Sequence, residues 1–231
     1  MFGPVVRVRR GSSDAAFLVV CEHASNRVPD VLGGLGLAPS LLKSHIAWDP
    51  GAVAVARGLA ERLAAPLAEG EISRLVYDCN RSPEAADGTP AQSEIHPIPG
   101  NRNLSAEARA ARVESIYAPF HARVAEEIAA HRASLRALVT VHSFTPVYFG
   151  AFREVEFGVL HGRDDRLAAA MMATAPVAAR LNQPYGPADG GAGTGTCKTR
   201  LDEFRFGRAS DGCDRRGGYV PGRPGTCRFR H

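Results

Sequence analysis

The 231-residue sequence predicts an α/β protein with a mixed or mostly parallel sheet, covered by helices on both faces in three layers. Two observations lead to this prediction. Short apolar segments alternate along the chain with longer amphipathic segments of helical periodicity. Several of the short segments also end in polar, chemically reactive residues. Because ligands of open α/β sheets bind at the carboxyl ends of the strands, these ends are the expected position of a site.

The short apolar segments are predicted to be strands. The weakly alternating residues 5–8 suit an edge strand, and the expected inner strands are residues 16–21, 71–78, 137–141 and 155–160. Ser40-Leu41-Leu42 are expected to open a short helical turn. Longer helices are expected at 52–65, at 106–133 (capped by Ser105 and interrupted by Pro119) and at 166–181. Residues 84–103 are rich in proline, glycine and polar residues, which predicts a long ordered loop over the site.

The end of the chain differs in composition from the rest. Residues 187–231 contain ten glycines, eight arginines and only two aliphatic side chains larger than alanine, Leu201 and Val220. We therefore expect a domain at 1–187 and an atypical Gly/Arg-rich tail at 188–231. The tail is expected to be disordered or loosely laid on the domain, because it cannot bury enough apolar surface to offset its ordering entropy. Its Arg and Gly content without periodicity also suggests the product of a shifted reading frame.

Charge and cysteine content limit the classes of partner. Residues 187–231 hold nine of the 28 Lys and Arg and five of the 24 Asp and Glu, so the entire net charge of +4 lies in the tail and the rest is balanced. This argues against a nucleic-acid partner. No apolar run reaches the ~18 residues of a membrane span. An odd number of cysteines without metal-type spacing, and no signal-peptide pattern, favour the cytoplasm.

Reactive residues follow three of the predicted strands. These groups are Glu22-His23, Asp78-x-Asn80-Arg81 and His142-Ser143, and a fourth group, His45-x-x-x-Asp49, lies between the first two. A spacing of four places two side chains on the same face of a helical turn. The sequence contains no H-E-x-x-H motif, no G-x-S-x-G elbow and no Walker loop, which argues against the enzyme classes that those motifs define.

Imidazoles and carboxylates at separate strand ends suit Zn²⁺, which takes three protein ligands in catalytic sites. A zinc-bound water has its pKa lowered to about 7 and attacks an amide carbonyl at neutral pH. Arg81 offers a planar fork for a substrate carboxylate. The alternative for Arg81 is an ion pair within the protein, with Asp78, Glu84 or Asp87.

Four segments together resemble the N-formylglutamate amidohydrolase family: CEHASNRVP at 21–29, HIAWDPGA at 45–52, RLVYDCNRSP at 74–83 and VHSFTP at 141–146. The resemblance implies a fold distantly similar to zinc carboxypeptidases and the phosphorylase/hydrolase-like proteins. It also implies metal-dependent hydrolysis of a small anionic N-acyl amino acid. The typical reaction converts N-formyl-L-glutamate into formate and glutamate in histidine degradation. Two alternatives stay open: another deacylase or carboxypeptidase-like amidase, and a catalytically impaired homologue that only binds an acidic metabolite.

The resemblance also assigns roles to residues. His23 and His142 are expected as metal ligands. The third ligand lies among Glu22, Asn26, His45 and Asp49. We favour Asp49 or His45, because strand alternation would turn Glu22 away from His23.

The remaining roles concern the substrate and the general base. Asn80 and Arg81 are expected to hold the substrate α-carboxylate with Ser143 nearby, and Arg74 or Arg102 the side-chain carboxylate. Family members usually end in an apolar strand with a Glu-x-Arg element that supplies a general base, and no such strand follows residue 187 here. Glu22 and Asp78 are therefore the expected catalytic residues, with Glu22 as the general base.

Overall fold

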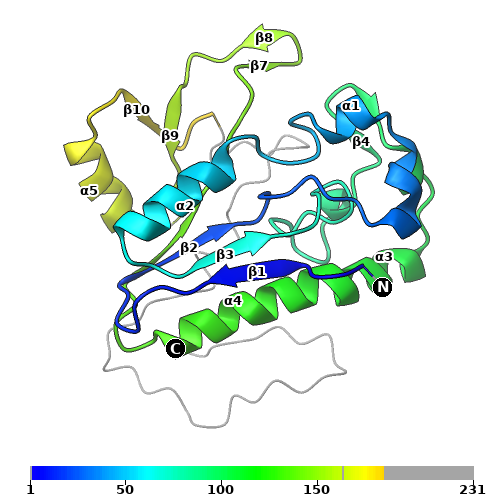
Figure 1. The fold of residues 1–231 in the computed structure, drawn as a ribbon. Helices are drawn as coiled ribbons and strands as arrows, with labels where there is room; N and C mark the ends of the chain where they lie inside the picture. The colour runs from blue at the N-terminus through cyan, green and yellow to red at the C-terminus, as the bar shows by residue number, and fades with distance from the viewer. Residues whose placement is uncertain (1, 163, 185–231) are drawn as a thin grey trace.

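A four-stranded mixed sheet lies at the centre of the computed structural model, which describes residues 2–162 and 164–184 (Figure 1). Its strand order is β1-β3-β2-β6. β2 pairs in parallel with both β3 and β6, whereas β1 runs antiparallel along the edge of β3. The strands are β1 (Val6–Arg9), β2 (Phe17–Cys21), β3 (Leu67–Gly70) and β6 (Ala137–Thr140).

Helices and short strand pairs surround this sheet. The helices are α1 (Pro39–Leu42), α2 (Ala52–Arg62), α3 (Ala106–Arg112), α4 (Ala118–Ala130) and α5 (Arg166–Thr174). Three small pairs add the strands β4 (Gln92–Ser93) with β5 (His96–Pro97), β7 (Val147–Tyr148) with β8 (Ala151–Phe152), and β9 (Phe157–Val159) with β10 (Ala179–Leu181). Short 3₁₀ segments occupy Asp30–Gly36, Ala86–Gly88 and Pro99–Asn101, and a π-helical turn occupies Val113–Tyr117.

Both faces of the sheet are buried, which explains why β2 is apolar at every position. Val19 and Cys21 of β2 pack against the alanine stripe of α2, at Ala52, Ala56 and Ala60. Leu18 and Val20 face the other way and join a larger core with side chains from the long helix, Ile116, Phe120 and Val124. Figure 1 shows α2 and α4 on opposite sides of the strands. A strand that is buried on both faces has a continuous apolar sequence, as β2 does.

Two predicted elements are wrong in position. The strand expected at residues 71–78 is absent: β3 ends at Gly70, and the following residues form buried turns. The last residue of β3 lies against the chain that follows β2, where only glycine fits: a Cβ on Gly70 would lie 2.1 Å from the Glu22 carbonyl oxygen. The helix expected at residues 166–181 ends at Thr174, and its last part is strand β10 instead. Pro176 explains this end, because proline cannot continue a helix.

The other elements agree with the sequence within a few residues, including the edge strand β1 and the helix α2. The long helix predicted at residues 106–133 is present as α3, the π-helical turn and α4, with the expected Ser105 cap: the N–H of Ala108 donates to its hydroxyl. Pro119 lies in the first turn of α4. The tail predicted at 188–231 lies outside the described residues, so its disorder or shifted frame stays a prediction.

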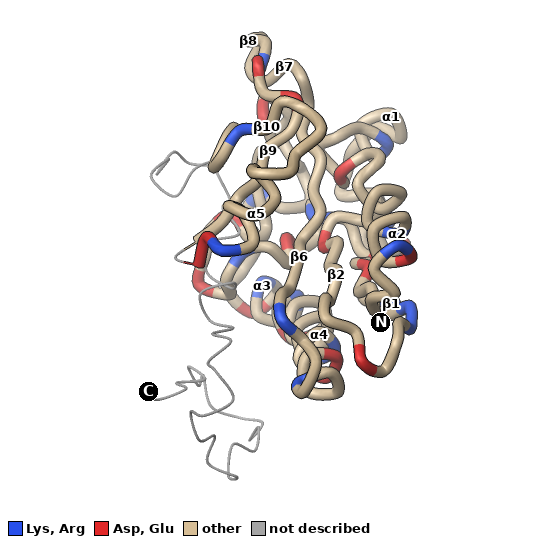
Figure 2. The backbone as a smooth tube through the Cα atoms, turned by 90° about the vertical axis from the view of Figure 1, so that its left-hand side faces the viewer, with Lys and Arg blue, Asp and Glu red and all other residues tan. Residues whose placement is uncertain are grey.

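Charged residues of both signs are interspersed along the described chain. Figure 2 shows lysine and arginine scattered among aspartate and glutamate along the chain, without a surface of one sign in this view. Within the described part, no helix is long and apolar enough to cross a lipid bilayer.

The buried turns after β3 need hydrogen-bond partners that no neighbouring strand provides. The side chains of two residues outside the turns supply them. Asn101 donates Nδ2 to the carbonyl oxygens of Leu75 and Pro90, each at 2.8 Å. Arg112 donates Nη1 to the carbonyl of Val76 at 2.9 Å and to Oδ1 of Asn101 at 2.7 Å. Since an unpaired buried carbonyl costs free energy, these contacts stabilise a segment without regular structure.

We expect Arg112→Met to lower the free energy of unfolding by about 2–4 kcal/mol, because it leaves two buried acceptors without a donor. Chemical denaturation measures this change. The matched control is Arg123→Met, since Arg123 forms partly exposed ion pairs with Glu126 and Glu127. This control should change the free energy by less than about 1 kcal/mol. Equal effects of the two substitutions would contradict the role of Arg112.

Candidate active site

Two histidines meet because β2 and β6 are parallel neighbours in register. Val20 pairs with Thr140, and the Val141 N–H donates to the Val20 carbonyl at 2.9 Å. Each strand ends within one residue of this point, and the chains continue side by side into loops. His23 and His142 therefore lie together at the carboxyl end of the sheet, with ring centroids 4.9 Å apart.

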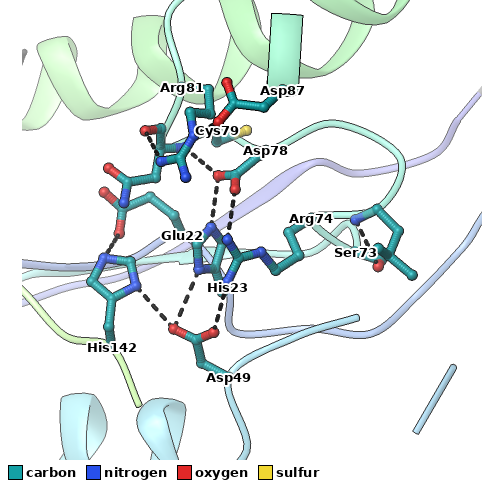
Figure 3. Close-up of polar contacts among 12 residues, drawn as sticks. Glu22, His23, Asp49, Ser73, Arg74, Asp78, Cys79, Arg81, Asp87 and His142 are labelled. Carbon is teal, nitrogen blue, oxygen red and sulfur yellow. Dashed lines mark hydrogen bonds and ion pairs between the residues drawn. The ribbon is translucent and has the colours of Figure 1, made fainter. Parts of the chain in front are cut away.

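Asp49 completes a group of three ligand atoms with these histidines (Figure 3). Its Oδ2 lies 3.2 Å from Nδ1 of His23 and 2.9 Å from Nδ1 of His142. The Asp49 N–H donates to the His23 carbonyl at 3.0 Å, which fixes the loop before α2 against the end of β2. All three ligand atoms lie within 4.8 Å of one another, and Asp49 and His23 are buried.

A second layer of carboxyl groups faces the outer nitrogens of both rings. Nε2 of His23 lies 2.8 Å from Oδ1 of Asp78. Nε2 of His142 lies 3.4 Å from Oε2 of Glu22. With the outer Nε2 atoms facing carboxylates, the two Nδ1 atoms lie on the Asp49 side and would be the ligand atoms when a metal ion is bound. The hydrogen bond between Asp78 and His23 is of the kind that orients a metal ligand and fixes its tautomer.

The electrostatics of His23 agree with a site for a cation. Burial and the nearby Arg74 guanidinium lower the pKa of His23, but the carboxylates of Asp78 and Asp49 outweigh them and raise it to about 9. Burial is the largest single influence and raises the pKa values of Asp49 and Asp78, but the neighbouring groups together lower both, His23 and His142 at Asp49 and His23, Arg74 and Arg81 at Asp78. The field at this point therefore favours positive charge.

The donor set fits a divalent metal ion. Ligand atoms about 2.0–2.2 Å from a tetrahedral zinc ion lie roughly 3.3–3.6 Å from one another. The two Nδ1···Oδ2 separations of 3.2 and 2.9 Å are close to that spacing. Two imidazoles with one carboxylate are also a ligand set that occurs in catalytic zinc sites. His23, Asp49 and His142 are thus the residues that could hold a metal.

Three other predicted site residues surround this group. Arg74 donates Nη2 to Oδ2 of Asp78 at 2.9 Å and Nη1 to Oδ1 of Asp49 at 3.4 Å, so it binds two carboxylates of the site. Ser143 donates its N–H to Oδ2 of Asp49 at 3.3 Å and its hydroxyl to the Pro50 carbonyl at 2.8 Å. Asn80 donates its N–H to Oδ1 of Asp78 at 2.9 Å.

Arg81 is buried and donates Nε to Oδ2 of Asp87 at 2.7 Å, one of the ion pairs considered from the sequence. Its Nη1 donates to the Asn80 carbonyl at 3.2 Å. No residue of the described chain accepts a hydrogen bond from its Nη2. The ion pair with Asp87 therefore holds the guanidinium in place from one edge.

Two sequence expectations about this site need correction. The structure does not bring His45 into the group: its Nε2 lies 2.9 Å from Oε2 of Glu94, because residues 43–48 form turns and the spacing of four does not align His45 with Asp49. Glu22 does not turn away from the histidines either. β2 ends at Cys21, so the alternation of a strand no longer determines the direction of Glu22. Asn26, the other open alternative, donates its side-chain amide to the Leu42 carbonyl at 2.7 Å.

Several residues that support the site were not singled out from the sequence. Glu94 joins three loops, because its second oxygen accepts the Phe149 N–H at 2.9 Å in addition to the His45 contact. Arg112 was also missed. It lies four and eight residues before the buried Ile116 and Phe120, on the apolar stripe of the helix. An arginine on such a stripe is a signal of a buried hydrogen-bonding role.

Comparison with known proteins agrees with this site. The family model described as N-formylglutamate amidohydrolase matches residues 15–201. The chain belongs to the N-formylglutamate amidohydrolase family. This is a family of hydrolases that act on amide bonds. The match includes every residue of the metal group and both second-layer carboxylates.

A solved structure is also similar to this member of the family. It is described as the crystal structure of gene product Atu2144 from Agrobacterium tumefaciens. The two chains are 51% identical, with a TM-score of 0.74, and the comparison covers 80% of this chain and 75% of that one. No curated protein matches the sequence.

We expect the purified protein, stripped with a chelator, to bind about one equivalent of Zn²⁺. His142→Ala should abolish this binding by removing a ligand. Asp78→Asn should weaken it by about 10–100-fold, because Asp78 orients His23 without being a ligand itself. Zinc titration measures both effects. His96→Ala is the control, since His96 lies in β5 outside the group; unchanged zinc binding in His142→Ala would rule out this site.

Proposed function

We propose that the protein is a metal-dependent amidohydrolase that cleaves N-formylglutamate, or a closely related anionic N-acyl amino acid, into the acid and the free amino acid. The carboxypeptidase-like, three-layer classification of the fold, a role in histidine degradation and a location in the cytoplasm belong to the same proposal. The observation that carries it is the convergence of two Nδ1 atoms and Asp49 Oδ2 within 4.8 Å, backed by Asp78 and Glu22. Family membership supports the amide bond as the target.

Within this proposal, a divalent ion held by His23, Asp49 and His142 supplies Lewis-acid polarisation of the amide carbonyl and a nucleophile from water at neutral pH. The protein groups hold and move the protons. Asp78 is a positioning residue, because its carboxylate binds His23 Nε2, Arg74 and the Asn80 N–H at once.

Glu22 is the proposed general base. Its side chain is buried, and its Oε2 has no hydrogen-bond partner among the described residues. The contact with His142 Nε2, at 3.4 Å, is close enough for an ion pair but does not have hydrogen-bond geometry. Such a carboxylate can accept the proton of the attacking water and pass it to the leaving amine nitrogen. The C–N bond then breaks, and the acyl group leaves with the oxygen of the water.

Arg81 and Asn80 are proposed to bind the α-carboxylate of the substrate. A guanidinium binds a carboxylate through two parallel N–H···O bonds, and Arg81 is held rigidly by Asp87 on its Nε edge. Ser143 supports Asp49 through its N–H and is proposed to act beside the substrate rather than on it. Arg74 binds the carboxylates of Asp49 and Asp78. We therefore propose that another cation binds the second carboxylate of the substrate.

We expect formate release from N-formylglutamate by the zinc-loaded protein, and a decrease in kcat of about 10²–10⁴-fold in Glu22→Gln. The substitution keeps the size of the side chain but removes its ability to accept a proton. Formate and glutamate are measured together, with zinc content as the control for an intact metal centre. Full activity in Glu22→Gln would exclude Glu22 as the base. Absence of formate release by the zinc-loaded wild type, with release of other acids from a panel of N-acyl amino acids, would identify a different deacylase.

Arg81→Ala should raise KM for N-formylglutamate by about 10–100-fold, since a charge-assisted hydrogen bond contributes about 1.5–3 kcal/mol. Initial rates over a range of substrate concentrations measure this effect. Arg123→Ala, which removes a partly exposed arginine of α4, is the matched control and should leave KM unchanged. An unchanged KM in Arg81→Ala would show that the α-carboxylate binds elsewhere.

A further inference from the structure

The side chain of Glu94 joins segments that come from three different parts of the sequence. Its Oε2 lies 2.9 Å from Nε2 of His45, and its Oε1 accepts the Phe149 N–H at 2.9 Å. Only 13% of the Glu94 side chain is exposed. The Phe149 N–H and His45 outweigh partial burial and hold the pKa of this carboxyl below its usual range. Glu94 is therefore a carboxylate at neutral pH, which is the stronger acceptor of hydrogen bonds.

Two of the joined segments each carry a residue of the metal group. His45 lies four residues before Asp49, and Phe149 lies seven residues after His142. Asp49 and His142 are in contact at 2.9 Å, so Glu94 connects the same two segments at a second point. Four residues span at most about 14 Å, and seven at most about 25 Å, even when fully extended. Glu94 therefore closes a ring of chain that has the metal group on one side.

Phe149 lies at the tip of the β7–β8 hairpin, residues 147–152, which packs little apolar surface against the protein. Figure 1 shows this hairpin projecting from the body of the molecule. The side chains of Val147, Phe149 and Phe152 are 47%, 61% and 74% exposed. A segment with few buried apolar contacts opens at a low cost in free energy. The position of the hairpin therefore depends on polar contacts such as the one with Glu94.

The backbone is strained at both ends of this contact. Glu94 and Phe149 are each the first residue of a two-residue turn, one between β4 and β5 and the other between β7 and β8. Both lie in the left-handed region, with φ of 51° and 49°. Glycine and asparagine are the usual residues at such turn positions, and a side chain as bulky as phenylalanine is an outlier there. Strained residues of this kind occur at ligand clamps and switch regions.

We infer that the β7–β8 hairpin is a movable flap beside the metal group and that Glu94 is its latch. The flap opens to admit substrate, and it closes when the Glu94 carboxylate accepts the Phe149 N–H. Glu94 is thus a positioning residue, and this inference rests on the proposed function for its substrate. Closure of a flap excludes water and retains the substrate. Without the latch the closed form is less populated, so the apparent affinity for substrate falls by the same factor.

Amide hydrogen exchange of the full chain tests the latch without any substrate. Glu94→Gly removes the carboxylate at a position where φ suits glycine, so the turn itself is preserved. We expect exchange in the peptide that contains Phe149 to become about tenfold faster, whereas zinc affinity should stay within about twofold. Mass spectrometry measures the exchange, and zinc titration measures the affinity. Glu94→Gln keeps one accepting oxygen and should give a smaller increase.

Asn103→Gly is the matched control for the added glycine. Asn103 is exposed and also left-handed, with φ of 55°, and it belongs to the same predicted loop at residues 84–103. This substitution should leave the exchange of the hairpin and the zinc affinity unchanged. Unchanged exchange in Glu94→Gly would overturn the inference. A loss of zinc affinity equal to the loss of activity would also overturn it, because Glu94 would then support the metal group and not the flap.

Formate release from N-formylglutamate provides the second measurement. Glu94→Gly should raise KM about five- to tenfold and change kcat by less than about twofold, since bound substrate can still close the flap. An unchanged KM together with faster exchange would overturn the role in retaining substrate. If the zinc-loaded wild type releases no formate, the proposed function fails, and the exchange measurement still decides whether Glu94 holds the hairpin.

Discussion

The rest of the site depends on the parallel pairing of β2 with β6. This register places two chain ends side by side at one edge of the sheet, so that His23 and His142 are neighbours although they are far apart in the sequence. Asp49 then joins them from the loop before α2, held by its own main-chain bond to His23. A shift of one residue in either strand would turn the ligand side chains to different faces. The burial of β2 on both faces resists such a shift.

The second requirement is a buried segment without regular structure. The turns between β3 and the loop at Asp87 carry Arg74, Asp78 and Arg81, and a strand at the same place would direct alternate side chains away from the site. Irregular backbone in the interior needs donors for its carbonyl groups. Asn101, Arg112 and His121 provide them, with His121 Nε2 on the Cys79 carbonyl at 3.0 Å. Through Arg112 and His121, the long helix thus stabilises the irregular segment that carries the site residues.

The sequence was informative where the physical signal is local. The continuous apolar run of β2 and the polar residues after it predicted a strand end with His23, and the same logic found His142. The alternating residues 71–78 predicted a strand wrongly, because a buried irregular segment places apolar side chains inward for reasons of tertiary packing. The spacing of His45 and Asp49 misled for a similar reason, since it assumes a helical turn. The positions of Glu22 and Arg112 are determined by contacts with residues that are distant in the sequence. A single sequence does not reveal such contacts.

Gly70 shows how firmly one of these positions is fixed. Its main chain lies directly against the carbonyl of Glu22, and no side chain stands between them. A contact made through side chains can adapt by a change of rotamer, whereas a contact between two main chains can change only if the strands themselves move. The position of the Glu22 main chain is therefore tied to that of the central sheet. The fold itself, rather than a mobile loop, thus determines where the main chain of the proposed general base lies.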